Sequence, residues 1–431
     1  MSIDNEQPAR CCDEFQSYQQ YLQGMRHSRR TFLKTTVGAI TATTLMPHML
    51  LDTAFADQVK DTAGGPILVV IQLAGGNDGL NTLVPFNSDL YYRDRPTINV
   101  PAKSVIPIDH AVGLNPNLQP LKPLYDQGKL AIIQGVGYPN PDLSHFRSTQ
   151  IWESGDPVGN TTTGWLGRYL DIALADVQNP LKALALGPSV PLTLRSETSP
   201  VPAIESVQSF RFALGRTTGA PVLAAYREMY GTTNPDVAPY VGIVRSIGAS
   251  ADKSVQDLQT IAARYTPSTV YPQNALGREL QLVAQMIASD LGTRVFHVTV
   301  GGFDDHVAEV YTHANLLKML AQGLAAFYQD IQTHGKADQV VTMTFSEFGR
   351  RIKENAGRGT DHGTAAPVFI AGGKVKGGIY GDDPLLSKTD SDGDLVYAID
   401  FRSVYGTVLD KWLGASSSAV LNSSFESLPF L

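Results

Sequence analysis

Residues 340–373 constrain the fold of this chain more than any other stretch. They begin with the apolar run VVTMTF, pass through a polar, glycine-rich segment and end in a second apolar run, APVFIAGG. Runs rich in apolar and β-branched residues are typical of strands buried on both faces of a parallel sheet. Because ligands collect at the carboxyl ends of such strands, we expect a binding site beside this stretch.

Three polar side chains fall at the expected edge. Glu347 closes the first apolar run, and Asp361 and His362 lie in the glycine-rich loop that follows it. Carboxylates and imidazoles are common ligands of divalent cations. We therefore predict that Glu347, Asp361 and His362 form half of a metal or phosphate-type site, and whether Glu347 or Asp361 is the ligand stays open.

Two further strands show the same design, an apolar run followed by glycines and a carboxylate. Residues 66–73 lead into AGGNDGLN with Asp78, and residues 293–300 lead into GGFDDH with Asp304 and His306. Asp304 and His306 are two residues apart, so both could reach one cation from an extended loop. The alternatives are an Asn-Asp-Gly turn without a ligand at Asp78 and a helix-capping role for Asp304.

A fourth strand, residues 129–136, leads into a polar loop and then a helix from about Thr149. Ser144 lies near the start of that helix, where an N-cap hydroxyl is expected. The same position suits a nucleophile, because a helix N-terminus stabilises anions. His145 and Arg147 lie close to Ser144 in the sequence and would donate hydrogen bonds to a developing oxyanion.

The first 56 residues have the order of an export signal. Residues 28–34 read SRRTFLK, an Ala- and Thr-rich apolar segment follows, and Ala54-Phe55-Ala56 matches an A-x-A cleavage site. We predict a twin-arginine signal peptide at 1–56, export of the folded protein, and a periplasmic or secreted location. The apolar segment is too short and too rich in Thr for a stable membrane span.

The composition excludes several classes of function. Both cysteines, Cys11 and Cys12, lie in the predicted leader, so the mature chain would contain no disulfide. The 431-residue chain has a formal net charge of -7 and no basic cluster beyond the leader. This charge argues against nucleic acid and anionic membranes as partners.

The alternation of strands and helices predicts an α/β fold. We expect residues 57–431 to form a doubly wound, mostly parallel central sheet flanked by helices. Amphipathic spacing predicts a helix at 278–291, and a second helix begins at 164–170. Residues from about 190 to 275 are the best candidate for a small helical cap or insertion.

Six motifs occur together in this chain and carry a family resemblance. In order they are GGNDGLN, SHF, GWLGR, GGFDDH, FSEFGR and GTDHG. With the predicted leader, they resemble the DUF1501 family across essentially the whole mature chain. That family resembles a branch of the alkaline phosphatase/sulfatase superfamily. The resemblance implies an alkaline phosphatase-like sheet with Ser144 as nucleophile and a metal site formed by Asp78, Asp304, His306, Glu347 and His362.

The resemblance also has departures. Many relatives have Asp-His where this chain has Glu347-Phe348, so a second metal would lose an imidazole unless Asp361 compensates. The sulfatase motifs C-x-P-x-R and S-x-P-x-R are absent from the sequence, which argues against formylglycine chemistry. One or two ions of zinc, manganese or calcium are the expected cofactors.

Three functions follow from these features. The first is an exported metal-dependent hydrolase of phosphate or sulfate esters, acting on a small molecule or a polysaccharide. The second is a non-catalytic binding or structural module that retains the fold and part of the metal site. The third is an accessory factor that binds polysaccharide. The twin-arginine export machinery is the expected protein partner.

Overall fold

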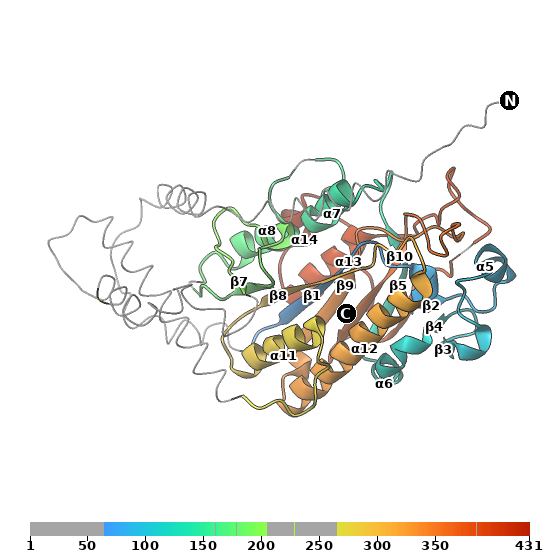
Figure 1. Cartoon of the computed structure of the whole chain (residues 1–431). Coiled ribbons are helices and arrows are strands. Elements are labelled where there is room, and N and C mark those ends of the chain that lie inside the picture. Colours follow the sequence, from blue (N-terminus) through green and yellow to red (C-terminus); the bar gives the residue numbers. More distant parts are fainter. Residues whose placement is uncertain (1–63, 160, 178, 205–227, 229–264, 385) are drawn as a thin grey trace. The chain divides into compact units, whose positions relative to one another are not determined.

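A computed structural model describes residues 64–159, 161–177, 179–204, 228, 265–384 and 386–431 (Figure 1). The chain divides into two compact units, Met1–Ala54 and Phe55–Leu431. The first unit, which holds nearly all of the predicted signal peptide, lies outside the described residues. Most of the predicted cap at 190–275 also lies outside them, so both assignments stay predictions.

Within the described residues, nine strands form one central sheet. Their order is β11-β5-β10-β9-β1-β8-β6-β7, and β12 also pairs with β5. The strands are β1 (Ile67–Ala74), β5 (Leu130–Gly137), β6 (Ala183–Leu186), β7 (Ala203–Ile204), β8 (Val295–Gly301), β9 (Val340–Phe345), β10 (Ala366–Gly372), β11 (Gly378–Tyr380) and β12 (Ile399–Asp400).

The strand directions decide which loops meet. β1 is parallel to both β8 and β9, and β10 is antiparallel to both β9 and β5. The loops after β1, β5, β8 and β9 therefore share one edge of the sheet with the loop before β10. The predicted mostly parallel sheet is confirmed.

β1 shows why these sequences form buried strands. Its side chains alternate, with Leu68 and Val70 packing on one face of the sheet and Val69 and Ile71 on the other. All four are fully buried. A run that is apolar at every position satisfies both faces, which is the condition for a central strand covered by helices on both sides.

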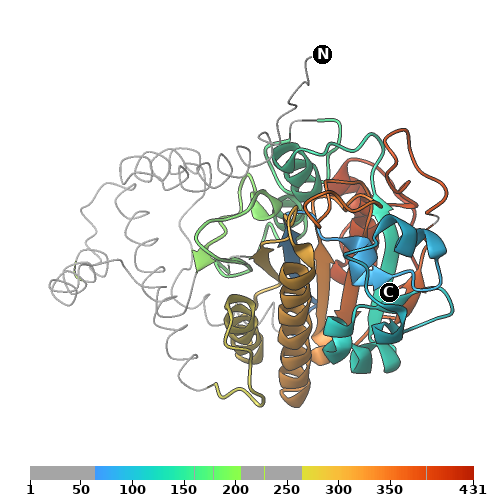
Figure 2. The ribbon, with the colours of Figure 1, turned by 45° about the vertical axis from the view of Figure 1, so that its right-hand side comes forward.

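Helices cover both faces of the sheet, as predicted for a doubly wound fold (Figures 1 and 2). The core of one face includes side chains of α11 (Ala275–Ala288), α12 (Glu309–Thr333) and the short α6 (Lys122–Asp126). The core of the other face includes those of α7 (His145–Ser154), α8 (Trp165–Ala173), α13 (Phe401–Thr407), α14 (Ser417–Leu421) and the π-helical segment Val408–Leu413.

Two helices begin earlier than the sequence predicts. α11 begins at Ala275 because Asn274 accepts a hydrogen bond from the N–H of Gly277 and caps the first turn. α7 begins at His145 rather than near Thr149, with Ser144 as its N-cap. The second shift places His145 in the first turn of a helix at the carboxyl edge of the sheet.

A small second sheet lies beside the loop after β1. It contains β2 (Leu83–Val84), β4 (Gly113–Leu114) and β3 (Ile106–Pro107), in that order. The short helices α4 (Gly79–Thr82) and α5 (Asp89–Asp94) flank β2 in sequence. No helix among the described residues is long and apolar enough to cross a membrane.

Candidate metal centre

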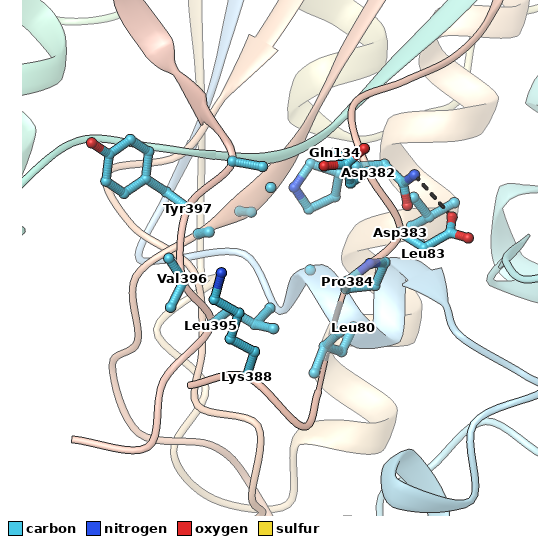
Figure 3. Close-up of a pocket in the computed structure, with 16 residues that line it drawn as sticks. Leu80, Leu83, Gln134, Asp382, Asp383, Pro384, Lys388, Leu395, Val396 and Tyr397 are labelled. Atoms are coloured by element: carbon cyan, nitrogen blue, oxygen red, sulfur yellow. Dashed lines mark hydrogen bonds between the residues drawn. The ribbon is translucent and has the colours of Figure 1, made fainter. Parts of the chain in front are cut away.

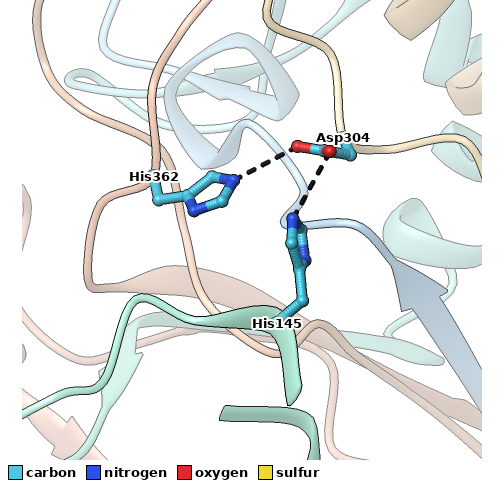
Figure 4. Close-up of side chains that lie close together, drawn as sticks. All are labelled: His145, Asp304 and His362. Carbon is cyan, nitrogen blue, oxygen red and sulfur yellow. Dashed lines mark hydrogen bonds and ion pairs between the residues drawn. The ribbon is translucent and has the colours of Figure 1, made fainter. Parts of the chain in front are cut away.

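Three imidazoles meet one carboxylate where the loops of the sheet edge converge. His145 comes from the start of α7, Asp304 and His306 from the loop after β8, and His362 from the loop before β10. Figure 4 shows His145 and His362 directed at Asp304 from two sides. Because β10 is antiparallel to β9, His362 lies at the same edge as the loop after β9.

Asp304 is the centre of this cluster. Its Oδ1 lies 2.9 Å from His306 Nε2 and 3.2 Å from His362 Nε2, and its Oδ2 lies 3.4 Å from His145 Nε2. The two Nε2 atoms of His306 and His362 are 3.0 Å apart. Ligand atoms of His145, Asp304 and His362 all lie within 4.8 Å of one another, close enough to hold one metal ion.

The other ring nitrogen of each histidine is already bonded. His362 Nδ1 lies 2.8 Å from the Leu143 carbonyl, His145 Nδ1 lies 3.0 Å from Glu347 Oε1, and His306 Nδ1 lies 3.2 Å from an Asp361 oxygen. Carbonyl and carboxylate oxygens only accept hydrogen bonds, so we assign the proton to Nδ1 in each ring. In the neutral rings, three Nε2 lone pairs then face Asp304.

Lone pairs that face a carboxylate repel it unless a cation lies between them. Histidines that bind metals almost always donate their second N–H to a carboxylate or a backbone carbonyl. The cluster has this arrangement three times, with Glu347, Asp361 and Leu143 as the acceptors. The donor set therefore fits a divalent metal.

The negative charge of the cluster also appears in the pKa values. Burial disfavours the charged form of His145, but hydrogen bonds and attraction from Asp304 and Glu347 outweigh burial and raise its pKa to about 9. Burial would raise the pKa of Asp304, but its interactions with the three histidines and the charge of Arg350 hold the pKa below its usual range. Burial lowers the pKa of His362, and the charges of Arg350 and His145 add to that effect.

Arg350 is a site residue that sequence reasoning did not single out. Its side chain is 1% exposed, and its Nη2 lies 2.8 Å from Asp304 Oδ1. The guanidinium also donates to the carbonyls of Gly75, Gly76, Phe303 and Thr360, which ties the loops after β1, β8 and β9 together. The motif FSEFGR contains Arg350, but no spacing distinguishes this arginine; only the tertiary contacts show that it neutralises the carboxylates of the site.

Glu347 and Asp361 lie behind the histidines rather than beside Asp304. Glu347 Oε1 accepts from the N–H of Gly75 at 2.8 Å and from His145 Nδ1, while its buried Oε2 has no hydrogen-bond partner among the described residues. Asp361 accepts from Asn355 Nδ2 at 2.9 Å and from His306 Nδ1, and its side chain is 54% exposed. Each carboxylate thus orients one imidazole.

Asp78 is engaged elsewhere. It caps α4 by accepting from the N–H groups of Leu80 and Asn81, and it forms a buried ion pair with Arg95. Burial opposes ionisation, but the charge of Arg95 outweighs it and holds the pKa of Asp78 below its usual range. This geometry matches the alternative that Asp78 belongs to a structural turn.

The glycines before Asp78 allow two loops to touch. Gly75 has φ +122°, and a Cβ there would lie 2.2 Å from the backbone nitrogen of Asp304. Gly76 has φ +86°, and a Cβ there would lie 2.4 Å from the ring of Phe348. Only glycine accommodates both the positive φ and the close approach, so these residues bring the loop after β1 against Asp304.

Ser144 lies next to residues that contact the cluster, whereas the Arg147 side chain is bonded to another loop. Ser144 is the N-cap of α7 without a side-chain capping hydrogen bond, and its neighbours on both sides, Leu143 and His145, contact the cluster. Arg147 donates to Gln150 and to the carbonyls of Pro157 and Gly159. The guanidinium in contact with Asp304 is that of Arg350 instead.

Phe348 forms an apolar wall of the cluster. Its ring centroid lies 4.4 Å from that of His362 and 4.9 Å from that of His145, and the residue is 1% exposed. This is the position at which the family resemblance implies a lost imidazole. The phenyl ring packs against two candidate ligands and offers no donor atom of its own.

A comparison with models of protein families agrees with the motifs in the sequence. Residues 131–417 match the sequence model of a family described as a protein of unknown function, DUF1501. No curated protein matches the chain.

Solved structures match the chain at low similarity. A protein in the alkaline phosphatase superfamily from Vibrio parahaemolyticus is 10% identical, with a TM-score of 0.31, over 78% of this chain and 72% of that one. The PsFucS1 sulfatase from Pseudoalteromonas sp. is 11% identical, with a TM-score of 0.34, over 88% and 75%. The periplasmic domain of EcEptC from Escherichia coli, a zinc complex, is 11% identical, with a TM-score of 0.31, over 73% and 75%. Similarities of this size assign no role to any residue here.

Proposed function

From the premise that this chain belongs to the DUF1501 family, we propose that it is an exported, metal-dependent hydrolase of phosphate or sulfate esters. One observation carries the proposal. Three imidazoles commit their Nδ1 hydrogens to outer acceptors and direct their Nε2 atoms at one partly buried carboxylate, Asp304. Histidines that bind metals almost always show this arrangement.

The donor atoms favour zinc or manganese over calcium. His145, His362 and Asp304 supply two imidazole nitrogens and a carboxylate oxygen, with His306 adjacent. Calcium prefers oxygen ligands alone, whereas zinc accepts nitrogen and oxygen together. One ion is the expected number, because Arg350 already supplies a fixed positive charge at Asp304 and Phe348 walls one side.

Ser144 is the proposed nucleophile. Its hydroxyl would attack the phosphorus or sulfur, the ester oxygen would leave with a proton as the alcohol, and water would then hydrolyse the serine ester to release phosphate or sulfate. The bound ion would polarise the non-bridging oxygens and favour loss of the hydroxyl proton. The N-terminus of α7 and the charge of Arg350 support the negative charge that develops there.

Export completes the proposal. The leader at 1–56 would pass the folded chain to the twin-arginine machinery, so the enzyme would act in the periplasm or outside the cell. A folded route suits a protein that acquires its metal before export. The substrate is then a small-molecule or polysaccharide ester that is present in that compartment.

A non-catalytic module is the second candidate, and one observation favours it. Arg147, the expected oxyanion donor, is held by the loop at 157–159. Arg350 and a protonated His145 would also neutralise Asp304 and Glu347 without a metal. A binding module predicts that Ser144→Ala changes neither activity nor stability, whereas the hydrolase loses activity and keeps its fold.

The test combines metal analysis with turnover. The exported protein should contain about one equivalent of zinc or manganese and should cleave an aryl phosphate or an aryl sulfate. Asp304→Asn combined with His362→Ala should lose both the metal and the activity. His334→Ala is the matched control, because His334 follows the last turn of α12, at the far end from its first residue, Glu309. Absence of bound metal after incubation with each ion would refute the hydrolase.

A further inference from the structure

We infer that a pocket lined in part by residues 382–384 and 395–398, between β11 and β12, binds a neutral sugar ring. The inference deepens the proposed hydrolase function and rests on it for the claim that this ring belongs to the ester substrate. The carrying observation is Gln134, which lines the pocket (Figure 3). This residue is only 2% exposed, and its Oε1 has no hydrogen-bond partner in the part of the chain that the structure describes.

The pocket opens at an interruption in the edge of the sheet. β11 and β12 both pair with β5, one on each side of Gln134 and Gly135. Between β11 and β12, residues 382–384 and 395–398 line the pocket. The pairing of β5 with β10 shifts register at the same place, and Gly135 has φ +60°. A β-bulge of this kind re-aims a side chain beside a site.

The Gln134 atom that has no hydrogen-bond partner among the described residues is Oε1, which is an acceptor. Gln134 Nε2 lies 3.4 Å from Asp383 Oδ1, and a carboxylate accepts hydrogen bonds, so the amide nitrogen faces Asp383. The oxygen is then the free end of the amide. Leaving a buried acceptor unbonded costs about 1–3 kcal/mol, and an O–H or N–H group of a ligand would remove that cost.

The rest of the lining selects a hydroxyl-rich ligand. Asp382 and Asp383 accept hydrogen bonds, whereas the Lys388 ammonium donates them and points into the pocket in Figure 3. A hydroxyl group both donates and accepts, so a polyol satisfies all of these groups together. The cavity volume of about 230 Å³ is below that of sites for drug-sized ligands and suits a single ring. Apolar lining comes from Leu80, Leu83, Pro367, Pro384, Leu395, Val396 and Tyr397.

The charge of the pocket excludes anionic rings. The charged side chains that line the pocket are those of Asp382, Asp383 and Lys388, so its net charge is negative. A sulfated or uronic sugar would place a second negative charge against these carboxylates, at a cost that low dielectric increases. The ring in the pocket is therefore neutral, even where the ester itself carries a phosphate or a sulfate.

A second cavity shares part of its lining with the pocket and reaches a residue that contacts the metal centre. It has a volume of about 390 Å³ and shares Leu395, Val396 and Tyr397 with the first pocket. Leu143 and Thr364 also line it, and the Leu143 carbonyl is the acceptor for His362 Nδ1. In this proposal, a glycan with its ester at the metal centre extends past Leu395, Val396 and Tyr397 and places a neighbouring ring against Gln134.

The experiment measures sugar binding without catalysis. Saturation-transfer NMR and calorimetry are run on the mature chain with methyl glycosides of glucose, galactose, mannose and N-acetylglucosamine, with a neutral oligosaccharide, and with glucuronic acid. Gln134→Met removes the amide at nearly constant volume. Lys388→Met changes an exposed residue, so its effect cannot come from misfolding. Thermal unfolding of both variants accompanies each titration.

The expected result is binding of at least one neutral glycoside, weakened five- to tenfold by Gln134→Met and two- to fivefold by Lys388→Met. Binding should persist after chelation of metal, because the pocket contains none of the candidate ligands. Stronger binding of the oligosaccharide than of the glycosides would identify a glycan as the source of the ring. The inference is overturned if no neutral sugar binds, if neither variant weakens binding, or if glucuronic acid binds equally well. Loss of hydrolase activity with sugar binding intact refutes the proposed function alone.

Discussion

The proton on each imidazole decides what the cluster can bind. His145, His306 and His362 each give one hydrogen to an outer acceptor, so their second nitrogens are all available at Asp304. The outer acceptors are two carboxylates and one backbone carbonyl. Removing one of these acceptors should lower the affinity for the metal without removing a metal ligand. Such variants therefore separate the orientation of the histidines from the coordination of the metal.

Asp361→Ala tests this separation. Without the carboxylate, His306 loses the partner that fixes its ring, and affinity for zinc should fall about tenfold or more. The side chain of Asp361 is 54% exposed, so stability should change little. Competition with a chromophoric chelator measures the affinity. Asp290→Ala is the control, because Asp290 is 50% exposed and pairs with Lys336; equal effects of the two variants would contradict the assignment.

The burial of Glu153 predicts that the stability of the protein depends on pH. It is buried in α7, and burial raises its pKa to about 7. The folded chain therefore holds this proton more tightly than the unfolded chain does, and stability falls as the pH rises from about 4.5 to about 7. Glu153→Gln removes that loss and should stabilise the protein at pH 8 by about 2–3 kcal/mol, with no gain at pH 4.5.

Urea unfolding of both proteins at pH 4.5, 6 and 8 measures the difference. The Glu153→Gln variant has no acid to titrate at this position, and its amide oxygen can still accept from the N–H of Leu192 as the carboxylate does. A stability difference that stays constant with pH would show that Glu153 does not titrate as its burial implies.

At the scale of residues, the sequence analysis singled out most residues of the cluster but not its positively charged side chain. Asp304, His306, His362 and His145 were all singled out, because carboxylates and imidazoles after apolar strands are visible as a pattern. Arg350 was not, since one arginine after a strand has no distinguishing spacing. The surroundings of Arg147 and Asp78 were not predictable either, because partners such as Pro157, Gly159 and Arg95 depend on tertiary contacts.

At the scale of elements, the direction of β10 determines the site. Its apolar run reads the same in a parallel or an antiparallel strand, so the sequence predicts the strand and not its direction. Antiparallel pairing with β9 lets the loop at 346–365 stay at one edge of the sheet. A parallel β10 would have required a crossover to the opposite edge, and His362 would then have lain far from Asp304.

Gly75→Ala tests the loop contact that this edge requires. The new Cβ would need a positive φ and would lie 2.2 Å from the backbone of Asp304. We expect a loss of about 2–4 kcal/mol in the free energy of unfolding and a weakened metal site. Gly128→Ala is the control: it has φ +67° and no described atom within 4 Å of its Cβ, so it should cost only about 1 kcal/mol. Urea unfolding measures both losses, and equal losses would contradict the contact.

At the scale of the whole molecule, the sheet brings together residues that are far apart in sequence. His145 and His362 are separated by more than two hundred positions, and Asp304 lies between them. Their meeting depends on strand order, which sequence periodicity does not contain. The family resemblance predicted that Asp304, His306 and His362 lie in one site, whereas the cavities that the acidic residues between β11 and β12 line have no signal in the sequence.

The most direct test of the central claim is X-ray absorption at the zinc edge on the mature protein loaded with one equivalent of zinc. The account predicts stoichiometric binding and a first shell that combines imidazole nitrogens with one carboxylate oxygen at about 2.0–2.2 Å. The imidazole scattering should fall in the His145→Ala, His362→Ala double variant. A shell of oxygens alone, or no retained zinc, would contradict a metal centre at Asp304.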